Sequence, residues 1–185
     1  MALFKVNTGT RDQEVCRLRW DWEIHIPELS ISIFLIPGQF VKNREDRVVV
    51  LNEVAARVIE EVRGQHPDFV FAYQGNPIET MHNNGWQAAR KRAAESYPAE
   101  LGEPAPEGFR NIRVHDLKHT FGRRLRAAGV SLETRKVLLG HTTGDITSHY
   151  SAPELSELIE AANRVCAGHS GKTPALTLIK HKALR

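Results

Sequence analysis

One stretch of the chain, from Trp22 to Leu51, is rich in β-branched residues that alternate with other residues. Alternation with a period of two is typical of half-buried strands, and a Pro-Gly pair marks a break between strands. The pattern predicts three short antiparallel strands, carried by Ile24 and Ile26, by Ile31, Ile33 and Leu35, and, after Pro37-Gly38, by Val48, Val49 and Val50. Three short strands form only one small sheet, so most of the core is expected to come from helices.

Apolar residues recur at helical intervals on both sides of this stretch. Val15 and Leu18 follow the Thr8-Gly9-Thr10 turn, and Asn52 can cap a helix that ends near Gly64. Further helices are expected over 84–94, over 115–128, from Ser131 to Leu139 and after Pro153, with a loop over 97–108 that holds three prolines and two glycines.

The length of the chain favours a single domain. With 185 residues, of which 41% are hydrophobic, it can form one substantial core but not two large ones. We expect a mainly α fold with a small three-stranded antiparallel β-sheet (α+β) over residues 1–166. Residues 167–185 are expected to form a basic C-terminal tail, because they hold no acidic residue and four cations: Lys172, Lys180, Lys182 and Arg185.

The composition argues against several classes of protein. No run of about 18 apolar residues is present, and the start lacks a secretory signal, so we expect a cytoplasmic protein with no membrane span. Cys16 and Cys166 form no CxxC pair, which argues against a disulfide framework and a thiolate zinc site. His115 and His119 are spaced like a metal pair, but the HExxH glutamate and an obvious third ligand are missing, so no metal is expected.

Cations, imidazoles and a phenol follow one another in the last third of the chain. The segment Val114-His115-Asp116-Leu117-Lys118-His119-Thr120-Phe121 precedes Leu139-Gly140-His141, and Tyr150 comes next. A phosphodiester under attack needs several donors aimed at its nonbridging oxygens, and a hydroxyl nucleophile makes a metal unnecessary. Tyr150 is the candidate nucleophile, because the polar residues around it indicate an exposed segment.

These residues, in this order, resemble the catalytic domain of the tyrosine recombinase, or phage integrase, family. In that family an early arginine and a lysine in a β-turn precede His-x-x-Arg, Leu-Gly-His and, nine residues after that histidine, a tyrosine. The matching residues of this chain are Arg11, Lys42, His115, Lys118, His141 and Tyr150, and His141 and Tyr150 are nine apart. The resemblance extends from about Thr8 to Val165, and five ordered elements are far more specific than any one of them.

The resemblance implies a role for each of these residues. Tyr150 attacks a DNA phosphorus to give a 3′-phosphotyrosyl link and a free 5′-hydroxyl. Arg11, Lys118 and His141 hold the phosphate oxygens. His115 accepts a proton and Lys42 donates one to the departing oxygen, as an imidazole and a lysine in a flexible turn are suited to do. No cofactor is expected, because the phosphotyrosyl bond conserves the energy needed for religation.

Lys118 departs from the family pattern, which has an arginine at this position. An ammonium carries the same charge as a guanidinium but lacks its planar fork, so a phosphate would be held less rigidly. Arg113, Arg123 and Arg124 are alternative sources of the missing geometry, although the helical wheel turns Arg124 away from His115.

The net charge of +3 is modest, but positive charge gathers around the His115 segment. Arg110, Arg113 and Arg123 lie there with only Asp116 as a nearby acid, which favours contact with the backbone of double-stranded DNA. The resemblance further implies a tetramer during synapsis, an upstream DNA-gripping domain that this chain lacks, and exchange of the tail between protomers. It also implies a bacterial or phage-encoded protein associated with the nucleoid.

Two other functions remain open at this point. A type IB topoisomerase shares the phosphotyrosyl chemistry and would relax supercoiled DNA without a specific site. A DNA-binding regulator, or a recombinase inactivated at Lys118, would keep the fold and the basic patch but form no covalent link with DNA.

Overall fold

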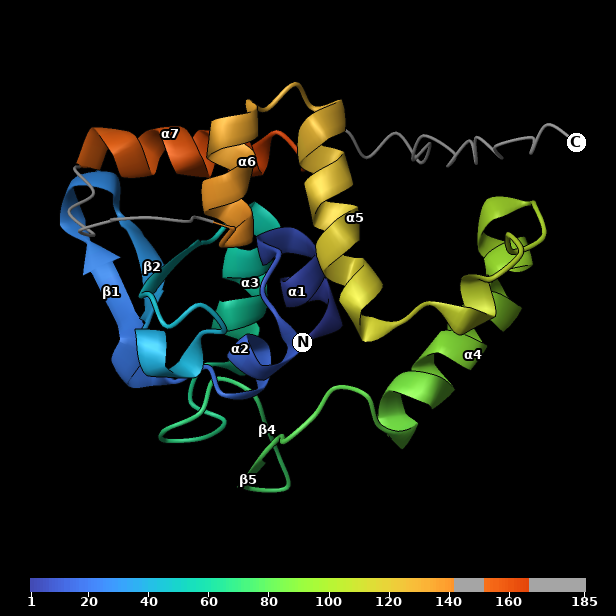
Figure 1. Ribbon diagram of the computed structural model, residues 1–185. Helices are drawn as coiled ribbons and strands as arrows, with labels where there is room; N and C mark the ends of the chain where they lie inside the picture. The colour runs from blue at the N-terminus through green and yellow to red at the C-terminus, as the bar shows by residue number, and fades with distance from the viewer. Residues whose placement is uncertain (142–151, 167–185) are drawn as a thin grey trace, which may run out of the picture.

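The computed structural model describes residues 1–141 and 152–166. Figure 1 shows a mainly helical molecule with a small sheet at one side. The helices are α1 (Ala2–Thr8), α2 (Asp12–Cys16), α3 (Glu53–Val62), α4 (Asn84–Leu101), α5 (Val114–Ala127), α6 (Leu132–Leu139) and α7 (Ala152–Asn163), with short 3-10 turns η1 (Trp20–Trp22), η2 (Pro27–Leu29), η3 (Gly38–Phe40) and η4 (Phe109–Asn111). This architecture confirms the predicted mainly α fold with a small antiparallel sheet.

The three predicted strands form one antiparallel sheet in the order β1-β2-β3. They are β1 (Glu23–Ile26), β2 (Ile31–Ile36) and β3 (Arg47–Val50), and β2 pairs with both neighbours. A second, two-stranded ladder joins β4 (Ala72–Tyr73) to β5 (Asn76–Pro77) through a turn at Gly75. The β-branched alternation therefore located the main sheet correctly.

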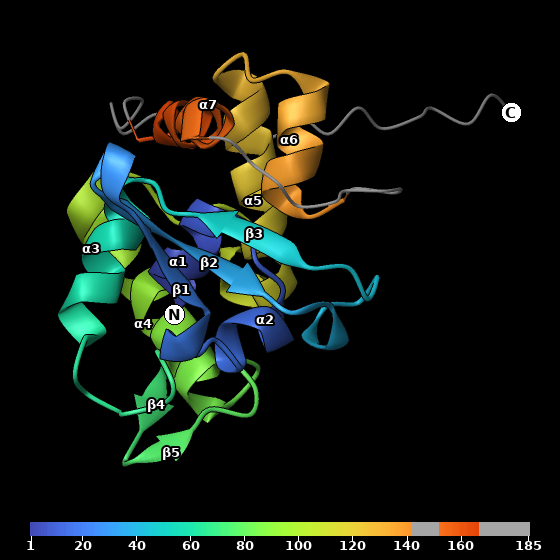
Figure 2. The same ribbon diagram turned by 90° about the vertical axis from the view of Figure 1, so that its left-hand side faces the viewer.

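The sheet buries side chains on both of its faces. Phe34 and Val49, which are paired across β2 and β3, belong to a core that also contains Phe4 of α1 and Ile59 of α3. The next pair along the strands belongs to a second core, made with α5, α6 and α7, whose central members are Ile33, Val50, Phe121, Leu125, Leu138, Leu155 and Ala162. Figure 2 shows α5, α6 and α7 gathered at one end of the molecule, beyond the sheet. Period-two alternation explains why neighbouring residues enter different cores.

Most of the predicted helix boundaries are confirmed. The Asn52 side chain accepts a hydrogen bond from the Ala55 amide (2.9 Å), and the Ser131 side chain accepts one from the Thr134 amide (3.1 Å), so both residues cap their helices. Gly140 adopts a left-handed conformation (φ 61°) at the end of α6. None of the described helices is long and apolar enough to cross a membrane.

Two helical predictions need correction. The first residues form α1, which the sequence did not predict, and Phe4 of this helix is fully buried against Phe71 (5.4 Å between ring centroids). In addition, α4 continues to Leu101 through Pro98, so the loop predicted over 97–108 begins later. The ring of Tyr97 packs against Phe109 (5.1 Å between centroids), which anchors the extra turns of α4 to η4.

Candidate active site

The turn that precedes α2 positions Arg11. Gly9 takes a positive φ of 63°, and the hydroxyls of Thr8 and Thr10 hydrogen-bond to each other across the turn (2.9 Å). Arg11 then occupies the N-cap position of α2, where its amide donates to Glu14 (2.6 Å). Its guanidinium donates to the other Glu14 oxygen (2.8 Å) and to the Gly140 carbonyl (3.2 Å). Arg11 is therefore tied to the end of α6, far along the chain.

Lys118 lies almost completely buried on α5, with 3% of its surface exposed. Its ammonium donates a hydrogen bond to the Leu139 carbonyl (2.5 Å). Burial, together with the nearby charges of Arg47 and Arg11, lowers the pKa of Lys118 to about 7. A lysine on the edge of the core, as predicted from its helical position, is thus present, but it is buried more deeply than a snorkelling side chain would be.

A second buried cation, Arg47, lies beside Lys118 and was not predicted. Arg47 is the first residue of β3, and its guanidinium is paired with Glu14. It also donates to the carbonyls of Gly9 (3.1 Å) and Leu138 (3.3 Å). The sequence offered a weak signal, since Arg47 directly precedes three valines in a strand, but no pattern indicated what would surround it.

None of the three arginines considered from the sequence supplies this guanidinium. Arg113 pairs with Asp116 at the start of α5 (3.2 Å), and Arg123 is exposed. Arg124 points toward α7 and donates to the Val165 carbonyl (2.8 Å), which agrees with the helical wheel. Arg47, from another part of the chain, is the arginine whose charge lies near Lys118, but it is buried.

Three cations bind three successive carbonyls at the end of α6. Arg47 binds Leu138, Lys118 binds Leu139 and Arg11 binds Gly140. The last carbonyls of a helix lack helical partners and carry the negative end of the helix dipole, so cations are favourable there. We call these three residues the cation cluster. His141 follows directly, so its position is set by the same contacts.

Both predicted imidazoles lie close to this positive charge. Partial burial lowers the pKa of His141, and the charges of Lys118 and Arg11 lower it further. The pKa of His115 is also lowered, by partial burial and by His119, whose ring contacts it edge to face (4.6 Å between centroids). Both rings are therefore neutral at pH 7 and each has a nitrogen free of its proton, as a proton acceptor needs.

A groove of about 810 Å³ opens at the Lys118 edge of the cation cluster, between α5, α6 and the segment around η4. Lys118 and His141 line it, together with His119, and three arginines continue it outward: Arg123, Arg126 and Arg135. His119, rather than His115, is the α5 histidine that lines this groove. Arg110 and Arg113, predicted to contact DNA, are exposed beside it but are not among its lining residues.

Positive charge exceeds negative charge around this cluster. Lys5 of α1 is fully buried and pairs with Asp12 (3.4 Å), next to Arg11. Within the described ranges, the local ion pairs supply two carboxylates, Asp12 and Glu14, for four cations. Buried cations without a matching anion are costly, so the site is electrostatically suited to an anionic ligand.

The remaining two predicted residues are not placed in this cluster. Lys42 is exposed on the connection between β2 and β3, where a lysine-bearing turn was expected. In the part of the chain that the structure describes, no hydrogen bond or ion pair joins Lys42 to the cation cluster. Tyr150 lies outside the described residues.

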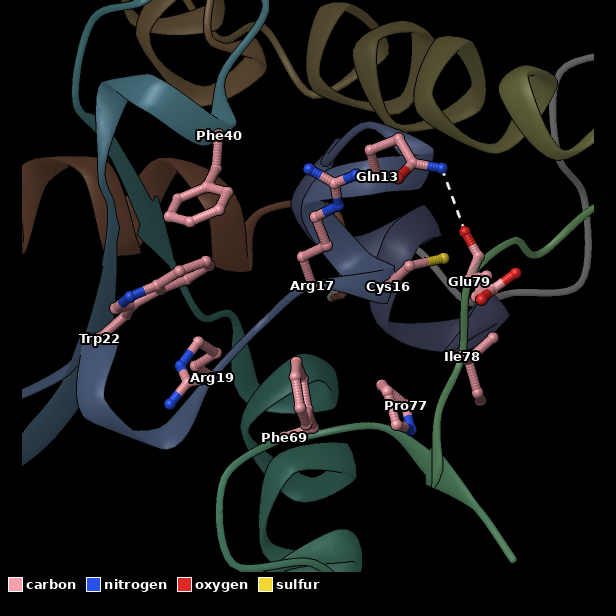
Figure 3. Close-up of a pocket in the computed structure, with 10 residues that line it drawn as sticks. All are labelled: Gln13, Cys16, Arg17, Arg19, Trp22, Phe40, Phe69, Pro77, Ile78 and Glu79. Carbon is pink, nitrogen blue, oxygen red and sulfur yellow. Dashed lines mark hydrogen bonds between the residues drawn. The ribbon is translucent and has the colours of Figure 1, made fainter. Parts of the chain in front are cut away.

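A second cavity, of about 500 Å³, lies on the other side of α2 (Figure 3). Its wall is largely apolar, with Trp22, Phe40, Phe69, Pro77 and Ile78, and the Gln13 side chain donates to the Glu79 carbonyl (3.1 Å). Arg19, at its edge, is already paired with Asp21 (3.0 Å) and Asp68 (3.5 Å). This cavity contains none of the predicted site residues, so the groove over the cation cluster is the candidate active site.

Comparison with known protein families assigns the chain as a whole. The model of the phage integrase family matches residues 1–157. The chain belongs to the phage integrase family. This assignment confirms the resemblance inferred from Arg11, Lys42, His115, His141 and Tyr150, and it places the Lys118 departure inside a true family member.

Relatives and solved structures of this family are distant but cover most of the chain. The integrase of Salmonella phage P22 is 24% identical over 192 residues, covering 97% of this chain and 45% of that protein. The tyrosine recombinase XerC of Pelobacter propionicus is 25% identical over 179 residues, covering 91% and 55%. The chain thus spans about half the length of the curated relatives it matches.

The fold is also that of a family member of known structure. The Tn1549 transposon integrase in complex with transposon right end DNA superposes with a TM-score of 0.53 at 22% identity, covering 86% of this chain and 56% of that one. The same integrase in complex with a circular intermediate DNA gives a TM-score of 0.54 at 18% identity, covering 86% and 52%. The integrase-family fold therefore accounts for nearly the whole chain.

Proposed function

We propose that this chain is the catalytic domain of a site-specific DNA recombinase that cleaves and rejoins double-stranded DNA through a 3′-phosphotyrosyl intermediate on Tyr150. The observation that carries the proposal is the cation cluster, in which Arg11 and Lys118 meet at the end of α6 beside His141. These side chains come from separate parts of the chain, and together they offer a phosphodiester the donors and the positive charge that its transition state requires.

In this proposal the DNA phosphate displaces two carbonyls from the cation cluster. Arg11 and Lys118, each held by one carbonyl in the free protein, turn toward nonbridging phosphate oxygens, with His141 as a third donor. The neutral ring of His115 accepts the phenolic proton of Tyr150, and Lys42 donates a proton to the 5′-oxygen as the P–O bond breaks. No cofactor is needed, because a 5′-hydroxyl later attacks the phosphotyrosyl bond. This step re-forms the phosphodiester, releases the Tyr150 hydroxyl and returns the protons to Tyr150 and Lys42.

Covalent trapping on DNA tests this function. The DNA is a nicked suicide duplex that carries the junction sequence of the genetic element encoding the chain. The expected result is a protein–DNA adduct with the wild-type chain and none with Tyr150→Phe, while the affinity for the duplex stays the same because only one oxygen is removed. Adducts that persist in Tyr150→Phe would refute the assignment of the nucleophile.

The same assay separates the two rival functions. Binding without any adduct favours a DNA-binding regulator. In that case the Lys118 ammonium stays bound to the Leu139 carbonyl and does not turn toward the phosphate. Relaxation of supercoiled DNA that lacks the junction sequence favours a type IB topoisomerase. Because the relatives are about twice as long, we also propose an upstream DNA-gripping domain as part of the working recombinase, and its addition is the control for a negative result.

We further propose that the protein assembles as a tetramer on DNA and that the basic tail over 167–185 packs on a neighbouring protomer. Leu176, Leu178 and Ile179 give this tail apolar side chains to bury, although it lies outside the described residues. Gel filtration on the junction duplex, with and without residues 168–185, checks the proposal. Loss of the larger species on truncation is expected, and unchanged assembly would argue against exchange.

A further inference from the structure

Arg47 is a buried arginine of the site that contacts three separate segments of the chain. It is 4% exposed, and its guanidinium reaches three segments of the chain: the Glu14 carboxylate in α2, the Gly9 carbonyl in the preceding turn and the Leu138 carbonyl in α6. Burying a guanidinium is costly unless its donors are satisfied by well-placed acceptors. Glu14 and the two carbonyls offset this cost, next to the carbonyl that Lys118 binds in the candidate active site.

One acceptor of Arg47, the Glu14 carboxylate, also orients Arg11. Glu14 accepts from both the amide and the guanidinium of Arg11 while it also pairs with Arg47, so one buried carboxylate joins the two arginines. The exposed fractions differ: the Arg11 side chain is 24% exposed and that of Arg47 is 3% exposed. Arg11 can therefore reach a ligand, and Arg47 cannot.

Arg47 also lies against the turn that carries His141. A Cβ atom added to Gly140 would lie 2.7 Å from the Nε atom of Arg47, so the backbone of this turn approaches the guanidinium closely. That Nε atom is buried and has no hydrogen-bond partner among the described residues. Because this donor is buried without a partner, its own hydrogen bonding does not fix the Arg47 side chain. The contacts with Glu14 and with the turn at Gly140 do so instead.

We propose that Arg47 is a positioning residue, which acts on the DNA phosphate only through Arg11 and the Leu138–His141 turn. It holds the Glu14 carboxylate so that the Arg11 guanidinium stays at the Gly140 carbonyl, and it fixes the end of α6 so that His141 stands beside Lys118. When a phosphate draws Arg11 and Lys118 away from their carbonyls, Arg47 keeps its own contacts and preserves the pocket. This inference rests on the proposed recombinase function.

Amide hydrogen exchange tests the positioning role without requiring catalysis. The variant is Arg47→Lys, which keeps the charge but places all its donors on one nitrogen, whereas Arg47 reaches Glu14 through one guanidinium nitrogen and the Gly9 and Leu138 carbonyls through another. We expect the amides of Arg11 and His141 to exchange at least about tenfold faster, while amides in the middle of α3 keep their wild-type rates, because only local contacts are lost. Arg63→Lys is the control, since it makes the same substitution at an arginine that pairs with Glu23 and Glu60, away from the site.

A double-mutant cycle on covalent trapping tests the route through Arg11. Arg47→Lys and Arg11→Lys are made singly and together, and adduct formation is followed in a single turnover at saturating duplex. Arg47→Lys should lower this rate roughly 10²-fold, by analogy with loss of an oxyanion donor, and change the duplex Kd less than about threefold. The double variant should be slower than Arg11→Lys alone by much less than the loss that Arg47→Lys causes by itself, because the two changes share the route through Arg11 and only the route through the Leu138–His141 turn remains.

The outcomes separate this inference from the proposed function. A wild-type chain that forms no adduct contradicts the function, and the exchange measurement still decides the positioning role. Wild-type exchange at Arg11 and His141 in Arg47→Lys overturns the inference, as do rate losses that multiply in the double variant. If Arg47→Lys unfolds, Glu14→Gln, which keeps the shape of the shared acceptor, takes its place in both experiments with the same expectations.

Discussion

Lys118 is the cation of the site whose pKa is lowered to near neutral pH. Its pKa is lowered to about 7 by burial and by Arg47 and Arg11, whereas a guanidinium at the same position would stay charged at all ordinary pH values. In the free protein Lys118 is thus largely protonated below pH 7 and largely neutral above it. A neutral amine holds a phosphate anion less well than an ammonium, so capture of DNA at this site should weaken as pH rises through 7.

The first prediction compares the wild-type chain with Lys118→Arg across pH 6 to 9 at limiting duplex, where the rate reports the ionisation of the free protein. The wild-type rate of adduct formation should fall above about pH 7, roughly tenfold per pH unit if the charged form alone is active. Lys118→Arg should lack this fall and equal or exceed the wild type at pH 8. A large loss at every pH in Lys118→Arg would show that position 118 does not serve as the arginine position of the family.

The residues of this site differ in how far the sequence could predict them. Arg11, Lys118 and His141 were predicted because each lies in a short ordered motif, and the structure brings them together at the end of α6. Arg47 was missed because its role depends on Leu138, 91 positions away, and no local pattern announces such a contact. Glu14 was missed for the same reason, since its spacing from Arg11 indicates only a helix start.

At the scale of elements, Asn52 joins three helices. Its side-chain oxygen caps α3, and its side-chain nitrogen donates to Asn7 of α1 (3.2 Å) and to the Ala162 carbonyl of α7 (3.4 Å). The residue is fully buried. The sequence predicted the cap from Asn52 and the helical spacing after it, but the contacts with α1 and α7 depend on how the helices pack and were not predictable.

The second prediction therefore concerns Asn52→Ala. Loss of a cap costs about 1 kcal/mol, and leaving buried partners without a hydrogen bond adds about 1–3 kcal/mol, so the free energy of unfolding should fall by about 2–4 kcal/mol. Asn83→Ala is the matched control, because Asn83 caps α4 through the Trp86 amide (3.0 Å) but is exposed, and it should cost about 1 kcal/mol or less. Denaturant unfolding measures both values, and equal losses would contradict the bridging role of Asn52.

The elements that the sequence misplaced share a physical cause. α1 has only seven residues, too few for a clear hydrophobic period, and it is stable because Phe4 and Asn7 are buried by other elements. α4 contains Pro98, which normally ends a helix, yet the contact between Tyr97 and Phe109 holds its last turns. Tertiary packing decided both cases, whereas the strands and α3, α5 and α6 carried their own local signals.

At the scale of the whole molecule, the candidate site joins the two cores. The turn before α2 brings Arg11, α2 brings Glu14 and β3 brings Arg47, while α5 brings Lys118 and His141 follows α6; β3 and α5 each contribute side chains to both cores. The groove is lined by residues of α5 and α6, among them Arg123, Arg126 and Arg135. Because the overall charge is only +3, attraction to DNA has to come from this local concentration of cations rather than from the protein as a whole.

The last prediction follows from this uneven distribution of charge. Each phosphate contact made by a cation releases counterions, so its loss should reduce the slope of log K against log salt by about 0.9. Arg123 lines the groove and is exposed, and Arg123→Ala should reduce the slope by about that amount and weaken binding similarly for all duplex sequences. Arg57→Ala, which removes the same charge from the exposed side of α3, should leave the slope unchanged. Equal reductions of the slope in the two variants would mean that binding depends only on the net charge of the protein. That result would contradict contact between the groove and the phosphate backbone.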